Sequence, residues 1–152
     1  MSLLGDLLTP SDILLGVDAG SKERVFELVS ALLYGRCGFA QAQLVDSLLA
    51  REECGSTAIG HGVAIPHARI KGLARPVGVY VRTKSPIPFD APDGKPVSDL
   101  IVLLVPEQAA QQHLKLLGEV AEMFGDVTFR QRLRAAVDPA EVHRLLSQSY
   151  RA

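Results

Sequence analysis

The spacing of apolar residues along the chain predicts alternating strands and helices. Three segments have the length and apolar content of strands: Ile13–Val17, Val77–Thr83 and Val97–Pro106. The third is apolar over almost its whole length, which is typical of a central strand covered on both faces. Pro86 and Pro88 follow the second segment, and since proline has no N–H group to donate, we expect strand pairing to stop there.

Helical periodicity marks the segments between and after these strands. Asp18 and Ser21 are candidate N-caps for the first helix, and Gly35 and Gly38 are expected to end it. Asp138, with a proline directly after it, has the pattern of an N-cap before the last helix. The predicted helices are the one that follows Ser21, then Ala40–Glu53, Gln111–Phe124, Phe129–Ala136 and Pro139–Ser149.

Interleaved elements of this kind predict an α+β fold, a single three-layer α/β/α domain with a mixed central sheet flanked by helices. No linker, repeat or low-complexity segment divides residues 1–152, so one domain is expected to span the chain. The helix over Gln111–Phe124 carries His113 in its first turn. Its inward face is expected to comprise Leu114, Leu117, Val120 and Ala121.

The charge balance excludes some classes of partner. The chain has 16 lysine and arginine residues against 17 aspartate and glutamate residues, which gives no electrostatic reason to expect nucleic acid or an anionic membrane surface as a partner. No apolar run approaches the ~20 residues of a membrane span, and the N-terminus lacks the basic region of a signal peptide. Cys37 and Cys54 are too few for a disulfide framework. We therefore expect a cytoplasmic protein with reduced thiols and no membrane insertion.

The stretch from Gly55 to His67 carries the most chemical information. Its glycines allow tight turns, and the proline near its end restricts Ile65 to an extended conformation. The backbone that carries His67 is therefore left with little freedom. A neutral imidazole, with an unperturbed pKa of about 6.5, is a nucleophile near neutral pH and a possible phosphoryl acceptor. The alternative is a histidine that merely donates to a backbone carbonyl at a turn.

Three motifs in the chain resemble a known family. Gly60-His-Gly-Val-Ala-Ile-Pro-His67, Leu103-Leu-Val-Pro106 and His113-Leu-x-x-Leu117 are similar to the enzyme IIA domains of the mannitol/fructose type, EIIA type 2, of the bacterial phosphoenolpyruvate phosphotransferase system. The nitrogen regulatory branch, IIA-Ntr, matches best. The resemblance runs from about Leu3 to Leu146. His61 departs from it, because the family usually has asparagine or an acidic residue between the two glycines.

The resemblance implies a site and a chemistry. His67 matches the family's phosphorylated residue and would carry the phosphoryl group as a tele-phosphohistidine. His113 matches a histidine that neighbours the phosphate, and Arg51 matches an arginine beside the site. A guanidinium suits the charged oxygens of a transferring phosphoryl group, and an imidazole N–H can donate to one of them. No metal and no cofactor are implied. Further candidates for binding phosphate, through hydroxyl or backbone N–H groups, are Ser56, Thr57 and Gly62.

Three functions are compatible with this resemblance. In the first, the chain accepts phosphate from an HPr-type phosphocarrier of the nitrogen branch and regulates protein targets, such as transporter or sensor-kinase subunits, according to its phosphorylation state. In the second, a sugar-specific IIA passes the phosphate to a IIB domain. In the third, the domain is a binding module without phosphotransfer, although the presence of Arg51, His67 and His113 argues against that.

A metal site is a rival interpretation of the histidines. His61, His67 and His113, with Glu52 or Glu53, would supply ligands of the right type. Their spacings match no zinc pattern, and neither cysteine lies where it would complete a set.

The other residues near the site have simpler interpretations. Cys54 is expected to be a small buried thiol that packs between helix and strand, and His143 to be a surface residue. Ser56 and Thr57 in the alternative interpretation only form the turn after the second helix. The surface that receives a phosphohistidine donor is expected to be apolar and shallow. Its candidate residues are Ile65, Ala68, Ile70 and the loop to Leu73, since the polar run from Arg69 to Pro76 is expected to form a loop.

Overall fold

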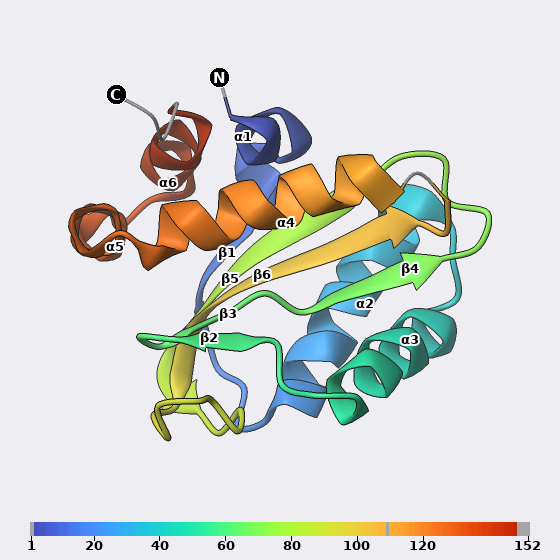
Figure 1. Cartoon of the computed structure of the whole chain (residues 1–152), viewed down its shortest axis with the longest axis horizontal. Helices are drawn as coiled ribbons and strands as arrows, with labels where there is room; N and C mark the ends of the chain where they lie inside the picture. The colour runs from blue at the N-terminus through green and yellow to red at the C-terminus, as the bar shows by residue number, and fades with distance from the viewer. Residues whose placement is uncertain (1, 109, 149–152) are drawn as a thin grey trace.

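The computed structural model describes residues 2–108 and 110–148, which form a mixed β-sheet between two layers of helices (Figure 1). One layer packs on a core that contains Phe26, and the other on a core that contains Phe124. The expected three-layer α/β/α arrangement is confirmed. The first layer comprises α2 (Lys22–Cys37) and α3 (Gln41–Glu53), and the second comprises α1 (Leu3–Leu7), α4 (Ala110–Gly125), α5 (Val127–Ala135) and α6 (Pro139–Ser147).

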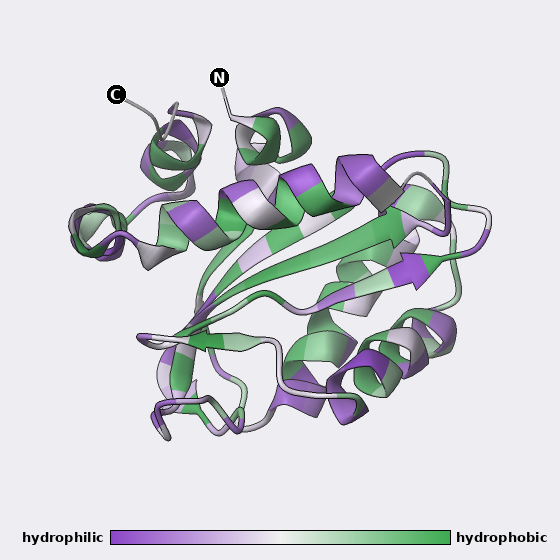
Figure 2. Ribbon diagram, viewed as in Figure 1, coloured by the Kyte–Doolittle hydropathy of each residue, from purple (hydrophilic) through white to green (hydrophobic). Residues whose placement is uncertain are grey.

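Six strands form the sheet in the described residues. Their order is β1-β5-β6-β3-β2, and β4 also pairs with β6. β5 and β6 are antiparallel, whereas β3 and β4 both run parallel to β6. β6 is therefore central, as its continuous apolar run predicted, and Figure 2 shows hydrophobic residues along it. The strands are β1 (Ile13–Val17), β2 (Ala58–Gly60), β3 (Val63–Ala64), β4 (His67–Ile70), β5 (Val77–Ile87) and β6 (Val97–Pro106).

Local capping sets the ends of the helices. The Ser21 side chain accepts from the N–H of Arg24 and begins α2, and Asp138 caps α6 in the same way, as predicted. Gly38 adopts the left-handed conformation and ends α2, whereas the prediction that Gly35 also ends it is wrong. Gly35 lies inside the helix because only Gly38 has the positive φ that terminates helical hydrogen bonding.

Two strand boundaries differ from the prediction. β5 continues through Pro86 to Ile87, because the pairing with β6 shifts register between Arg82 and Ile87 and the proline lies in that irregular stretch. β4 includes Arg69 and Ile70, where the sequence predicted the start of a polar loop. Parallel pairing with β6 satisfies its backbone groups, and this pairing is a tertiary contact that local sequence does not reveal.

The inward face of α4 is rotated from the expected one. Leu114 is 68% exposed and Ala121 is exposed, whereas His113 and Leu116 are buried. Val120 is buried as predicted. Apolar residues lie on more than one side of this helix, so packing on the sheet selects the face.

The last two helices also differ slightly from the prediction. Asp126 caps α5, which begins at Val127 and thus before Phe129. The predicted end of the last helix, Ser149, lies outside the described residues. None of the helices in the described part combines the length and hydrophobicity needed to cross a membrane.

Close packing between α1 and α6 predicts a cost for a single added methyl group. A Cβ on Gly5 would lie 2.4 Å from the Cα of Ser147, whereas a Cβ on Gly35 would meet no atom within 4 Å. Gly5→Ala should lower the free energy of unfolding by about 1–3 kcal/mol through overpacking. Gly35→Ala, the matched control, should leave it unchanged or raise it by up to about 1 kcal/mol. Urea denaturation measures both, and a Gly5→Ala variant as stable as the wild type would contradict this account of the packing.

Candidate functional site

His67 begins β4, and the register of that strand sets the direction of its side chain. In the parallel pair, His67 is the partner of Leu103 and Ala68 that of Leu104. Leu103 belongs to the core on the α4 side, whereas Ala68 and Leu104 belong to the core on the α2 and α3 side. Since paired residues share a face of the sheet, His67 projects on the face that α4 covers.

The His67 ring is fixed by a backbone contact. Its Nδ1 lies 2.8 Å from the carbonyl oxygen of Ile65. A carbonyl only accepts, so Nδ1 must carry the hydrogen and donate it, which leaves the lone pair on Nε2. Among the described residues no hydrogen bond to Nε2 is present. The alternative interpretation, in which His67 donates to a backbone carbonyl at a turn, is therefore correct for Nδ1. It does not exclude a nucleophilic role for Nε2.

The surroundings of His67 favour its neutral form. Partial burial is the largest influence and lowers the pKa below its usual value of about 6.5. The positive charges of Arg51 and Arg69 lower the pKa further, while the hydrogen bond to Ile65 and the charge of Glu52 act in the opposite direction. The neutral ring, with a lone pair on Nε2, is therefore favoured near neutral pH.

Arg51 reaches the site from α3. Its Nη1 donates to the carbonyl oxygen of Gly55 at 2.9 Å, so the guanidinium lies against the start of the glycine-rich stretch. Arg51 and His67 line the same pocket, which has a volume of about 420 Å³. The complete lining is Ser47, Arg51, His67, Ala68 and Arg69. The pocket thus combines a nucleophilic nitrogen with guanidinium groups and suits a small anion.

His113 lies under the first turn of α4, on the face that packs against the sheet. It is only 4% exposed, and neither ring nitrogen has a hydrogen-bond partner among the described residues. Burial, and after it the charge of Arg69, lowers its pKa below the usual value. A buried polar group without a partner costs about 1–3 kcal/mol, so a ligand that accepts its N–H would relieve a real penalty. His67 projects on the same side of the sheet.

Arg69 belongs to the pocket, although sequence reasoning missed it. It follows His67 by two positions in β4 and pairs with Val105, so the two side chains leave the strand on the same face. The two-residue period of a strand would have placed Arg69 on the same face as His67. Because this segment was interpreted as a loop, that period was not applied to it.

The second group of candidate phosphate ligands lies in other contacts. The Ser56 hydroxyl donates to the carbonyl of Phe89 at 2.6 Å and accepts from the N–H of Ala58. The Thr57 hydroxyl donates to the buried Glu52 carboxylate. These two hydroxyls stabilise the turn after α3, which was the alternative interpretation of Ser56 and Thr57. Because both hydroxyls already donate to other groups, they are not free to donate to phosphate.

Gly62 lies in the hairpin between β2 and β3 and not in the His67 pocket. Its carbonyl accepts from the N–H groups of Ser98 and Asp99, and a Cβ would lie 3.1 Å from the guanidinium of Arg134. With a φ of 79° it serves the tight turn.

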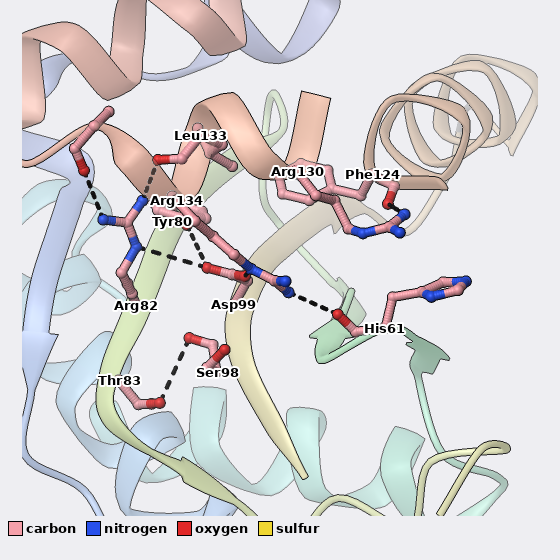
Figure 3. A network of polar contacts seen from close by, with 11 residues as sticks. His61, Tyr80, Arg82, Thr83, Ser98, Asp99, Phe124, Arg130, Leu133 and Arg134 are labelled. Carbon is pink, nitrogen blue, oxygen red and sulfur yellow. Dashed lines mark hydrogen bonds and ion pairs between the residues drawn. The ribbon is translucent and has the colours of Figure 1, made fainter. Parts of the chain in front are cut away.

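His61 precedes Gly62 and belongs to a separate polar network (Figure 3). Its carbonyl accepts from Arg134, which also donates to Asp99 at 3.0 Å. Asp99 is 2% exposed and accepts from the Tyr80 hydroxyl at 2.6 Å, while Arg82 lies 3.7 Å away. Figure 3 shows the imidazole of His61 pointing away from this network. The network fixes the backbone of the hairpin and leaves the His61 ring exposed.

The metal site considered as a rival is not formed. Within residues 2–108 and 110–148, no three His, Cys, Asp or Glu side chains are grouped so that they could hold a metal ion. His61 lies in the hairpin, and Glu52 is bonded to Thr57 and lies 3.7 Å from Lys22.

Three expectations about neighbouring side chains are wrong. Cys54 is exposed and not buried, because it follows the last turn of α3 at the surface. His143 is half-buried, and its Nε2 contacts the carbonyl oxygens of Gly5 and Leu8, so it joins α6 to α1. The expected apolar docking surface does not exist as described, because three of its candidates are 5% exposed or less: Ile65, Ala68 and Ile70. Leu73, at the end of the expected loop, is half-buried.

Comparison with known proteins gives consistent similarities. The family model for the phosphoenolpyruvate-dependent sugar phosphotransferase system, EIIA 2, matches residues 6–149. The chain is 43% identical to the nitrogen regulatory protein of Pseudomonas aeruginosa over 137 residues, which cover 90% of this chain and 89% of that protein. The crystal structure of the nitrogen regulatory protein IIA-Ntr from Neisseria meningitidis has a TM-score of 0.92 and 42% identity, and covers 96% of this chain and 100% of that chain. The fructose-specific EIIA component of Haloferax volcanii is 31% identical over 144 residues, 93% of each chain.

Partial burial of His67 and the charges around it predict how the ring titrates. Its pKa should lie below 6.5, and Arg51→Gln should raise it, because the variant removes a positive charge that disfavours the imidazolium. Arg75→Gln is the control, since Arg75 is exposed and lies outside the pocket. NMR titration of the ring nitrogens measures each pKa. A His67 midpoint at or above 6.5, or one that Arg51→Gln leaves unmoved, would show that the electrostatics are wrong.

The same pKa shifts predict how stability depends on pH. The pKa values of His67 and His113 are lower in the folded chain than in the unfolded one, so below pH 6.5 the unfolded chain binds more protons. The free energy of unfolding should therefore fall as the pH drops from about 6.5 toward the folded pKa values. Denaturation at a series of pH values should show a smaller fall in His67→Asn and in His113→Asn.

Proposed function

This chain belongs to the EIIA 2 family of the phosphoenolpyruvate-dependent sugar phosphotransferase system, and we propose that it carries a phosphoryl group on Nε2 of His67. The observation that carries the proposal is the hydrogen bond from Nδ1 to the carbonyl of Ile65. It selects the tautomer whose Nε2 has a lone pair, and it holds the ring beside the pocket that Arg51 lines.

The transfer follows from this tautomer. The lone pair of His67 Nε2 attacks the phosphorus of the donor's phosphohistidine, and the new N–P bond forms as the donor's N–P bond breaks. The electron pair of the broken bond returns to the donor imidazole. The ring of His67 gains positive charge, which the carbonyl of Ile65 stabilises through the Nδ1–H. The donor is an HPr-type phosphocarrier, and no metal or cofactor takes part.

Two further residues bind the transferring group. Arg51 has N–H groups besides the one bonded to Gly55, and these suit the charged equatorial oxygens of the phosphoryl group. His113 is a neutral, buried imidazole with an unsatisfied N–H, which a phosphoryl oxygen would accept. Both interactions would favour a phosphoryl group on His67 over solvent.

Of the two candidate functions, we favour regulation of protein targets by the phosphorylation state of His67. Similarity to nitrogen regulatory proteins supports it, and similarity to a fructose-specific EIIA component supports the second candidate, transfer to a sugar IIB domain. The pocket holds the guanidinium groups of Arg51 and Arg69, and a phosphoryl group adds roughly −1.5 to −2 charge at pH 7. A partner that binds the unmodified, cationic site would lose that attraction when His67 is phosphorylated.

His67 should be the only residue that accepts the phosphoryl group. After incubation with phosphoenolpyruvate, enzyme I and an HPr-type donor, mass spectrometry should find one phosphoryl group on the wild type and none on His67→Ala. His61→Ala is the matched control and should be phosphorylated like the wild type, because its ring is exposed outside the pocket. Arg51→Ala and His113→Ala should accept phosphate about 10- to 1000-fold more slowly.

Two results would overturn this assignment. A phosphorylated His67→Ala variant would place the acceptor elsewhere. Wild-type rates in both Arg51→Ala and His113→Ala would show that neither side chain contacts the transferring group.

The two candidate outcomes predict opposite partner preferences. In a pull-down from bacterial lysate, transporter or sensor-kinase subunits should be enriched on the wild type and on His67→Ala but not on the charge mimic His67→Asp. Rapid loss of the phosphoryl group from His67 to a purified sugar IIB domain would favour transport over regulation.

A further inference from the structure

Arg69 is an exposed residue that lines the His67 pocket, and its guanidinium is not bonded to any described residue. Arg51 donates to Gly55, and Arg134 donates to Asp99 and to His61. For Arg69, by contrast, there is no hydrogen bond or ion pair to any described residue, so its five N–H donors are available to a ligand.

The strand geometry places the Arg69 side chain on the same face of the sheet as His67. His67 and Arg69 are alternate residues of a strand paired in register with Leu103 and Val105. Both therefore leave the sheet on the face covered by α4, while Arg51 approaches from α3, which packs on the other face. An anion on Nε2 of His67 would thus meet guanidinium groups from two directions. The charge of Arg69 also influences the pKa of both His67 and His113, which is consistent with a position near both rings.

We propose that Arg69 is a second phosphate-binding arginine, which donates hydrogen bonds to the phosphoryl oxygens on His67 opposite Arg51. The proposal rests on the proposed phosphoryl transfer to His67 and adds a residue to it. A transferring phosphoryl group spreads its charge over three equatorial oxygens, and Arg51, whose Nη1 is bonded to Gly55, approaches them from the α3 side only, so Arg69 can bind oxygens that face the α4 side. Arg69 is therefore a catalytic residue and determines how tightly the pocket holds an anion.

The first test measures transfer from a phosphorylated HPr-type donor. Arg69→Gln should slow phosphorylation of His67 by about 10- to 1000-fold. Arg69→Lys should recover only part of the rate, because an ammonium restores the charge without the planar fork. Arg75→Gln is the matched control, an exposed arginine that lines a different pocket, and should transfer at the wild-type rate.

The second test separates this inference from the proposed function. Inorganic phosphate is titrated while NMR follows the His67 ring, and Arg69→Gln should weaken binding by about 10-fold or more relative to the wild type and to Arg75→Gln. Equal phosphate affinity, or equal transfer rates, in wild type and Arg69→Gln would overturn the role of Arg69. A wild type that binds phosphate through Arg69 but never accepts a phosphoryl group would instead overturn the proposed function and leave the anion site standing.

Discussion

The parallel pairing of β4 with β6 is the constraint on which the site depends. It places His67 beside Leu103 and Arg69 beside Val105, so both side chains lie on the face of the sheet that α4 covers. The N–H of Leu103 bonds to the carbonyl of Pro66 at 2.8 Å and fixes the residue before His67. A slip by one residue would turn His67 toward the core on the α2 side and bring Ala68 to the pocket.

The site combines three elements that lie far apart in the sequence. α3 brings Arg51 and β4 brings His67 and Arg69 to one pocket, while α4 carries the buried His113 on the same face of the sheet as His67. Positive charge beside a half-buried imidazole has two consequences that act together. Together with partial burial, which is the larger influence, it lowers the pKa of His67 and so favours the neutral, nucleophilic ring, and it would attract the anion that we propose the ring receives. The unsatisfied N–H of His113 carries a cost that a bound phosphoryl oxygen would relieve.

Local sequence made much of the fold predictable and singled out His67 as the candidate acceptor, whereas tertiary contacts decided the rest. The capping of α2 by Ser21, the central position of β6 and the chemistry of His67 all follow from neighbouring residues. The inward face of α4 and the strand that contains Arg69 depend on what packs against them. Hydrogen bonds between distant residues decided the role of Ser56, whose hydroxyl is bonded to Phe89.

The central claim is that the Nδ1 bond to Ile65 reserves Nε2 of His67 for the phosphoryl group. NMR of the phosphorylated, ¹⁵N-labelled protein tests it most directly, because the ³¹P coupling identifies the ring nitrogen that bears phosphorus. The account predicts coupling to Nε2 of His67, with the Nδ1 hydrogen still present. Coupling to Nδ1, or to a nitrogen of any other histidine, would contradict it.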